Sequence, residues 1–66
     1  MGATARQLAA DDTRKRLFAS AVALFGSVGY HATTVDAIVK RAGCAKGTFF
    51  VHFATKDAVV IELVRR

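Results

Sequence analysis

Side chains that could carry out a reaction are few in this chain of 66 residues. Histidine and cysteine, the usual residues of proton transfer, nucleophilic attack and zinc binding, occur only as His31, His52 and Cys44. They lie in no metal-ligand spacing, and the sequence has neither a glycine-rich phosphate loop nor a convergent pair of carboxylates. A single cysteine also excludes an intrachain disulfide and a cysteine-based zinc site. We therefore expect no enzyme activity, no metal and no cofactor.

The charged side chains indicate binding instead. Ten Lys and Arg stand against five Asp and Glu, which gives a net charge of +5. Such an excess favours an anionic partner, whether a nucleic acid, a membrane surface or an acidic protein, although a soluble domain can be basic without one. The amino-terminal run MGATARQLAADD lacks the apolar stretch of a signal peptide, and no run reaches transmembrane length. We expect a cytoplasmic protein.

One segment, residues 35–53, has the pattern of a helix-turn-helix, in which a turn of three or four residues joins two short helices at a steep angle. Apolar residues at helical spacing predict a first helix over 35–42, and Gly43 supplies the backbone freedom for the turn. The second helix is expected over 46–52, with Cys44 as a small buried plug before it. The wedge between the two helices can be filled by Ile38, Ala42 and Phe49.

The outer face of the second helix is where this segment could read DNA, because an α-helix fits the major groove. That face would show Lys46, Gly47, Thr48 and Phe50. Gly47 is informative, since a glycine in the first turn of a helix costs about 1 kcal/mol relative to alanine. We expect a close approach between the backbone and DNA to compensate for this cost. A plain helical hairpin that begins with glycine is the alternative.

Two further helices must hold this segment in place. The first is expected to begin at Asp11 or Asp12, which can cap its amino terminus, and to end before Gly29. The other should begin after Thr55, and its apolar residues cover more than one face, so we expect part of it to be exposed. The predicted fold class is all-α: a three-helix, homeodomain-like bundle with a helix-turn-helix, plus the start of a fourth helix.

The run RLFASAVALFGSVGYHATTVDAIVKRAGCAKGTFFVHFATKD resembles the DNA-binding domain of the tetracycline-repressor (TetR) family. The resemblance covers roughly residues 13–64, and its marks are weak singly but strong in this order and spacing. They are Ala21, Leu24-Phe25, Gly29-Tyr30, Thr33-Thr34, Ile38, Ala42-Gly43, Lys46-Gly47-Thr48, His52-Phe53 and Lys56-Asp57. The resemblance implies a sequence-specific repressor whose recognition helix enters the major groove of an operator half-site.

It further implies that the full-length protein is a homodimer on a palindromic operator in double-stranded DNA, released by a small-molecule effector that binds a C-terminal domain absent from this chain. On this interpretation residues 1–10 form a flexible arm, residues 11–54 the helix-turn-helix domain, and residues 55–66 the first part of a linking helix. The main alternative is a helical protein-interaction or dimerisation module without specific DNA binding. A membrane-surface helix is disfavoured because glycine stops and caps divide the chain.

The resemblance also assigns DNA contacts residue by residue. Positions that touch phosphate in the family match Thr33, Thr34, His52 and Lys56. Positions that approach bases and backbone match Lys46, Gly47 and Thr48, and both lysines are expected to be exposed. Phe50 stands where the family usually has Tyr, so it lacks a hydroxyl for phosphate and could offer only ring contact, for example to a thymine methyl group. Ala45 similarly replaces a frequent Ser.

Overall fold

A computed structural model describes the backbone of residues 5–65 and the side chains of residues 11–65. Over that range the chain forms helices and no strand: α1 (Ala5–Val28), α2 (Val35–Ala42), α3 (Lys46–His52) and α4 (Lys56–Arg65). The predicted all-α fold class, with a helix-turn-helix and the start of a fourth helix, is confirmed. None of the described helices is long and apolar enough to cross a membrane.

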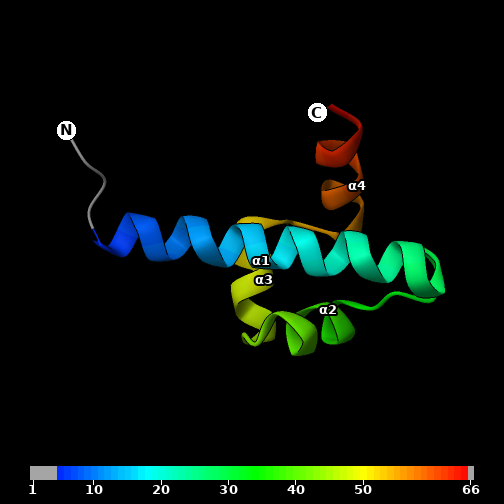
Figure 1. Ribbon diagram of the computed structural model, residues 1–66, viewed down its shortest axis with the longest axis horizontal. Coiled ribbons are helices and arrows are strands. Elements are labelled where there is room, and N and C mark those ends of the chain that lie inside the picture. The colour runs from blue at the N-terminus through cyan, green and yellow to red at the C-terminus, as the bar shows by residue number, and fades with distance from the viewer. Residues whose placement is uncertain (1–4, 66) are drawn as a thin grey trace.

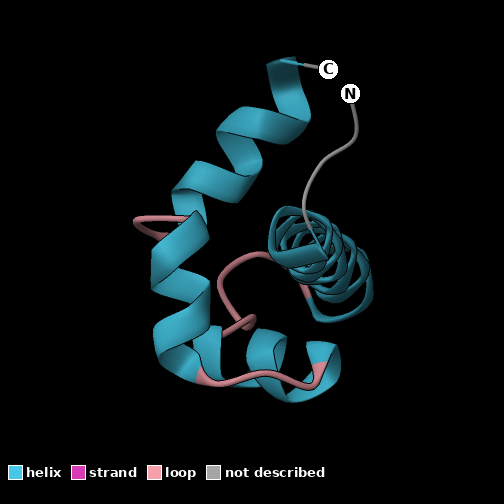
Figure 2. Ribbon diagram, turned by 90° about the vertical axis from the view of Figure 1, so that its left-hand side faces the viewer, coloured by secondary structure: helices cyan, strands magenta, loops and turns pink. Residues whose placement is uncertain are grey.

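Helix α1 is the scaffold of the molecule. It runs along the longest dimension, with α2 and α3 on one side and α4 leaving steeply on the other (Figure 1). Each of the other three helices packs against it. In Figure 2, where α1 is seen nearly end-on, the shorter helices lie to its left and below it.

The amino-terminal boundary of α1 differs from the prediction. The helix begins at Ala5, so Asp11 and Asp12 lie inside it and do not cap it. Residues 5–10, ARQLAA, are mostly strong helix formers without Gly or Pro, and they extend the helix past the acidic pair. Of the predicted arm, residues 5–10 are therefore helical, and residues 1–4 lie outside the described residues.

The remaining helix boundaries follow local signals that the sequence contains. Gly29 and Gly43 adopt left-handed backbone angles, with φ of 90° and 76°, and end α1 and α2. The hydroxyl of Thr34 caps α2 by accepting the N–H of Ala37 at 3.0 Å. Thr55 caps α4 through its own side chain, at 3.3 Å from an amide nitrogen in the first turn. The predicted stops at Gly29 and Gly43 and the start of α4 after Thr55 are confirmed.

The core lies where the four helices meet. Its buried apolar side chains are Leu17, Ala21, Ile38, Val39, Ala42, Phe49, Phe53 and Val59. The rings of Phe49 and Phe53 pack with centroids 5.5 Å apart, and Phe49 is fully buried. The predicted wedge of Ile38, Ala42 and Phe49 is thus confirmed. Cys44, expected as a buried plug, is only half-buried against this core.

An ion pair joins α1 to α4. Nη2 of Arg14 donates to both carboxylate oxygens of Glu62, each at 2.7 Å. The guanidinium group also lies 4.9 Å from the centroid of the Phe53 ring, at the edge of the core. Because both side chains are partly screened from solvent, this contact restrains the angle at which α4 leaves α1 more than an exposed ion pair would.

Phe49→Ala should lower the free energy of unfolding by about 3–5 kcal/mol, because it removes a fully buried ring and leaves a cavity. Phe50→Ala is the matched control, since the adjacent ring is 48% exposed, and we expect a loss of less than about 1 kcal/mol. Urea denaturation followed by circular dichroism measures both. Equal losses for the two variants would contradict the placement of Phe49 in the core.

Candidate nucleic-acid interface

The short helix α3 packs against the core with one face and exposes another to solvent. Phe49 and Phe53 point into the core, which leaves Lys46, Gly47 and Phe50 exposed, as predicted from the sequence. Val51 is exposed as well, by 79%. The four exposed residues are spaced i, i+1, i+4 and i+5 and therefore share one face of the helix. We call these four residues the α3 strip.

Gly47 is not required by the packing of the chain itself. A Cβ atom added there would meet no other heavy atom within 4 Å, and its φ angle is not in the left-handed region. The fold would therefore accept alanine, which is the better helix former. Thr48, which we expected on the outer face, is only half-buried and marks the border of the strip.

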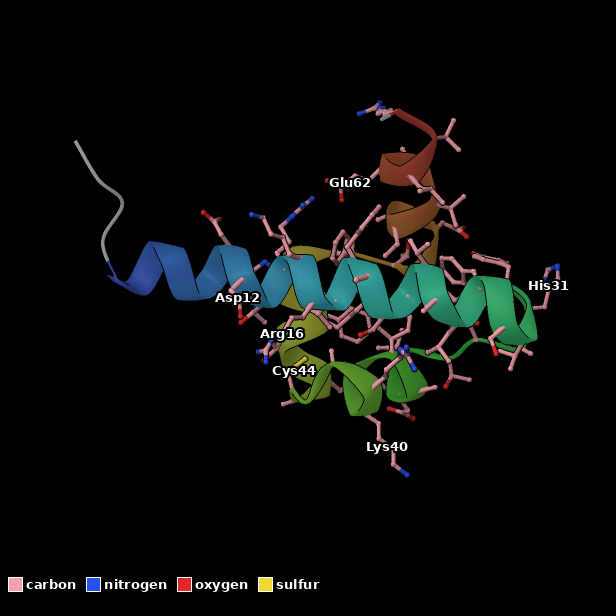
Figure 3. All side chains as sticks on the ribbon, viewed as in Figure 1. Asp12, Arg16, His31, Lys40, Cys44 and Glu62 are labelled. Atoms are coloured by element: carbon pink, nitrogen blue, oxygen red, sulfur yellow. The ribbon has the colours of Figure 1, made fainter. Side chains whose placement is uncertain are left out.

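A carboxylate lies beside the lysine of the strip. Nζ of Lys46 is 3.4 Å from Oδ1 of Asp36 in α2, and both side chains are largely exposed. Exposed pairs of this kind contribute about 0–1 kcal/mol, so the ammonium can be recruited by another anion at little cost. Another lysine, Lys40 of α2, projects away from the body of the protein (Figure 3).

The two threonines before α2 have different roles. Thr34 is exposed, and its hydroxyl caps the helix as acceptor for Ala37, which leaves its own O–H free to donate. Thr33 is 1% exposed, its hydroxyl donates to the carbonyl of Gly29 at 2.8 Å, and its N–H bonds to Tyr30. Both donors of Thr33 are therefore used within the chain, and its contact with phosphate stays a prediction.

Lys56 is half-buried rather than exposed, which corrects the second lysine prediction. Its ammonium donates to the carbonyls of Tyr30 and Thr33, at 2.7 and 2.8 Å, and lies 4.1 Å from the centroid of the Tyr30 ring. The first residue of α4 is thus tied to the turn that precedes α2. Two of its three N–H donors are used in this way, and one remains.

His52, the last residue of α3, lies on the side that approaches α4. It is half-buried and lines a hollow of about 470 Å³ together with Arg14, Glu62 and Arg65. Among the described residues, no group of three or more His, Cys, Asp or Glu is placed to hold a metal ion.

The structure brings together some of the predicted site residues and separates others. Lys46, Gly47 and Phe50 share the α3 strip, whereas Thr33 and Lys56 belong to the internal network around the turn before α2. Val51 was missed by the sequence-based reasoning. Its spacing from Gly47, four residues along a predicted helix, is the signal that places it on the same face.

Known proteins resemble this chain in sequence. Residues 17–63 match the model of a family described as bacterial regulatory proteins, tetR family. The HTH-type transcriptional regulator LmrA of Bacillus subtilis is 35% identical over 54 residues, which cover 80% of this chain and 29% of the relative. UidR, an HTH-type transcriptional regulator of Escherichia coli K12, is 31% identical over 58 residues, covering 88% of this chain and 30% of the relative.

An uncharacterized HTH-type transcriptional regulator of Bacillus subtilis, YdgC, is 38% identical over 53 residues, or 80% of this chain and 27% of the relative. The chain therefore spans less than a third of the length of each of these curated relatives. No solved structure matches it significantly.

Lys56→Met should lower the free energy of unfolding by about 1–3 kcal/mol, because it removes two charge-assisted hydrogen bonds and keeps the apolar stem. Lys40→Met removes the same charge from an exposed lysine and should change stability by less than about 0.5 kcal/mol. Thermal and urea denaturation of the two variants test this difference. If both unfold at the wild-type midpoint, the internal role of Lys56 is wrong.

Proposed function

Because this chain belongs to the tetR family of bacterial regulatory proteins and is a DNA-binding part of a transcription regulator, we propose that α3 lies in the major groove of an operator half-site. The observation that carries the proposal is the α3 strip. This seven-residue helix buries Phe49 on one face and leaves the strip exposed on another. With this face against the bases, α2 crosses the DNA backbone and presents its amino terminus to it.

Phosphate contacts fix such a helix in the groove, and four side chains support them. The free O–H of Thr34 can donate at the amino terminus of α2, where the helix dipole also favours an anion. Lys46 exchanges its weak pairing with Asp36 for a phosphate. The remaining N–H of Lys56 and the ring of His52 complete the set at the junction of α3 and α4. Thr33 stays a predicted contact outside this set, because both of its donors are used within the chain.

Bases and sugar–phosphate backbone are approached at the start of α3. The open space around Gly47 supports a close approach of DNA to the helix backbone, and Thr48 borders the same area. A side chain at position 47 would fill this space. The absence of a Cβ atom is thus explained by the partner rather than by the fold.

The length of the relatives supports a wider proposal about the whole regulator. Because the curated relatives are more than three times as long as the segment they share with this chain, we infer that the DNA-binding domain predicted over residues 11–54 also includes the start of α1 from Ala5, and that residues 55–66 begin a linking helix to a further domain. That domain would hold the homodimer together on a palindromic operator and bind a small-molecule effector. The whole would act in the cytoplasm as a repressor without enzyme activity.

The surface of α4 favours a protein contact in addition to DNA. Ile61, Leu63 and Val64 are exposed, and a hollow of about 610 Å³ lies between this helix and the end of α1, lined by Phe25 and Tyr30. Apolar side chains gathered in this way are typical of a surface that another protein segment covers. Packing against the remainder of the regulator accounts for them without replacing the DNA-binding function.

Titration of fluorescent duplex DNA with the chain at several salt concentrations tests the central proposal. Affinity should fall steeply with salt, and Lys46→Ala should reduce the slope of log K against log salt by about 0.9, the value for one phosphate contact. Arg65→Ala, which removes the same charge at the far end of α4, is the control and should leave the slope unchanged. Absence of binding at low salt would contradict the proposal.

Gly47→Ala should have opposite effects on stability and on DNA binding. Stability rises by about 0.5–1 kcal/mol from helix propensity, because the new methyl group meets nothing in the chain. Affinity for DNA falls by about fivefold or more, because a methyl group forced into a packed contact costs about 1–3 kcal/mol. Gly26→Ala in α1, which also has open space, should raise stability and leave DNA binding unchanged. Unchanged affinity of Gly47→Ala would contradict the close approach.

A further inference from the structure

The α3 strip holds one of the side chains that most often read bases by hydrogen bonding, Lys46, and no other. Bidentate recognition uses Arg or Lys for guanine and Asn or Gln for adenine, and Glu or Asp can accept from cytosine. The sequence of α3, KGTFFVH, contains none of these except Lys46. Lys46 is also held beside Asp36, and we have assigned its ammonium to a phosphate. Thr48 can also bond to a base edge, but a threonine hydroxyl discriminates little between bases, so hydrogen bonds from this helix carry only part of the sequence discrimination.

Two apolar side chains occupy the rest of the strip. Phe50 is 48% exposed and Val51 is 79% exposed, although valine is a poorer helix former than most residues that could stand at a solvated position. The ring of Phe50 meets the ring of Phe49 in a T-shaped contact, with centroids 5.3 Å apart. Val51 belongs to no packed cluster of the described residues. The fold gains little from Val51, and about half of the Phe50 side chain stays open to a partner.

Only one group on the edge of a base in the major groove is apolar. Thymine presents its C5-methyl group there, whereas the other edges present hydrogen-bond donors and acceptors. An apolar side chain placed against this methyl group gains free energy from excluded water, and the same side chain against an unpaired donor or acceptor loses it. A strip with two adjacent apolar side chains thus discriminates between bases by their methyl groups.

We propose that Val51 is a specificity-determining residue, and that it reads, together with Phe50, the C5-methyl groups of thymines in the operator half-site. The proposal rests on the function proposed above and adds the class of base that α3 selects. Val51 acts by direct contact and not through the fold, since it is the most exposed apolar side chain of the strip. The half-site read by α3 consequently contains thymines at the positions of strongest discrimination.

The experiment first selects bound sequences from a random duplex pool with the chain at low salt. Each enriched thymine is then replaced by deoxyuridine, which deletes the C5-methyl group and keeps every hydrogen-bonding edge. The dissociation constant should rise about threefold to fivefold for each methyl group that is contacted. With Val51→Ala, at least one of these replacements should have no further effect, because the contacting side chain is already gone.

Val64→Ala is the matched control. This valine is 78% exposed on α4, so its truncation removes the same two methyl groups at the same exposure but away from α3. It should bind the thymine and deoxyuridine duplexes with the wild-type ratio. Circular dichroism and thermal midpoints should be unchanged for both valine variants, since neither side chain lies in the core.

The outcomes separate this inference from the proposed function. If the chain binds no duplex, the proposed function fails. If it binds duplex DNA but tolerates deoxyuridine at every thymine, the DNA-binding function stands and the reading of methyl groups is overturned. If deoxyuridine weakens the binding of wild type and of Val51→Ala equally at every position, Phe50 or the backbone carries the effect and the role of Val51 is overturned.

Discussion

The burial of Phe49 is the constraint on which the rest of the structure depends. A helix of seven residues is too short to be stable alone, so its position is set by what it buries. Phe49 and Phe53 fix the rotation of α3 about its own axis by packing under α1 and against α2. That rotation decides which side chains are free. The identity of the exposed face is therefore a consequence of the core, and a change in core packing would turn the face away from any groove.

A second constraint comes from charges that the chain uses internally. Arg14 and Lys56 each donate to two acceptors within the protein, so two of the cations that give the sequence its basic character hold α4 in place, and a single N–H of Lys56 remains for a partner. Lys46 is also paired within the protein, but its partner Asp36 is exposed, so its ammonium is more easily available to a partner. Net charge thus overstates the positive surface that is available to DNA. The distinction between structural and available cations follows from burial and distance, not from composition.

Much of the fold could be predicted because its signals are local. Gly43 ends α2 and Thr34 caps it within a few residues, and the apolar spacing predicted the wedge around Phe49. The predicted start of α1 was wrong because the helix propensity of the residues before Asp11 outweighs the tendency of this aspartate to cap a helix. The role of Lys56 was out of reach, since its acceptors lie 23 and 26 residues away and depend on how the turn before α2 packs. Val51 lay within reach, because helical spacing alone places it on the strip.

The ion pair between α1 and α4 has a consequence for the order in which the chain folds. Arg14 and Glu62 are 48 residues apart, so their contact closes a loop of most of the chain, whereas α2 and α3 meet across a short turn. Contacts that close long loops form late, because the entropy lost on closure is largest for them. We therefore expect the contact between α1 and α4 to form after α2 and α3 have packed against each other. The backbone amides of α4 should exchange with solvent deuterium faster than those of α2, and a protease would find its first cleavage site there.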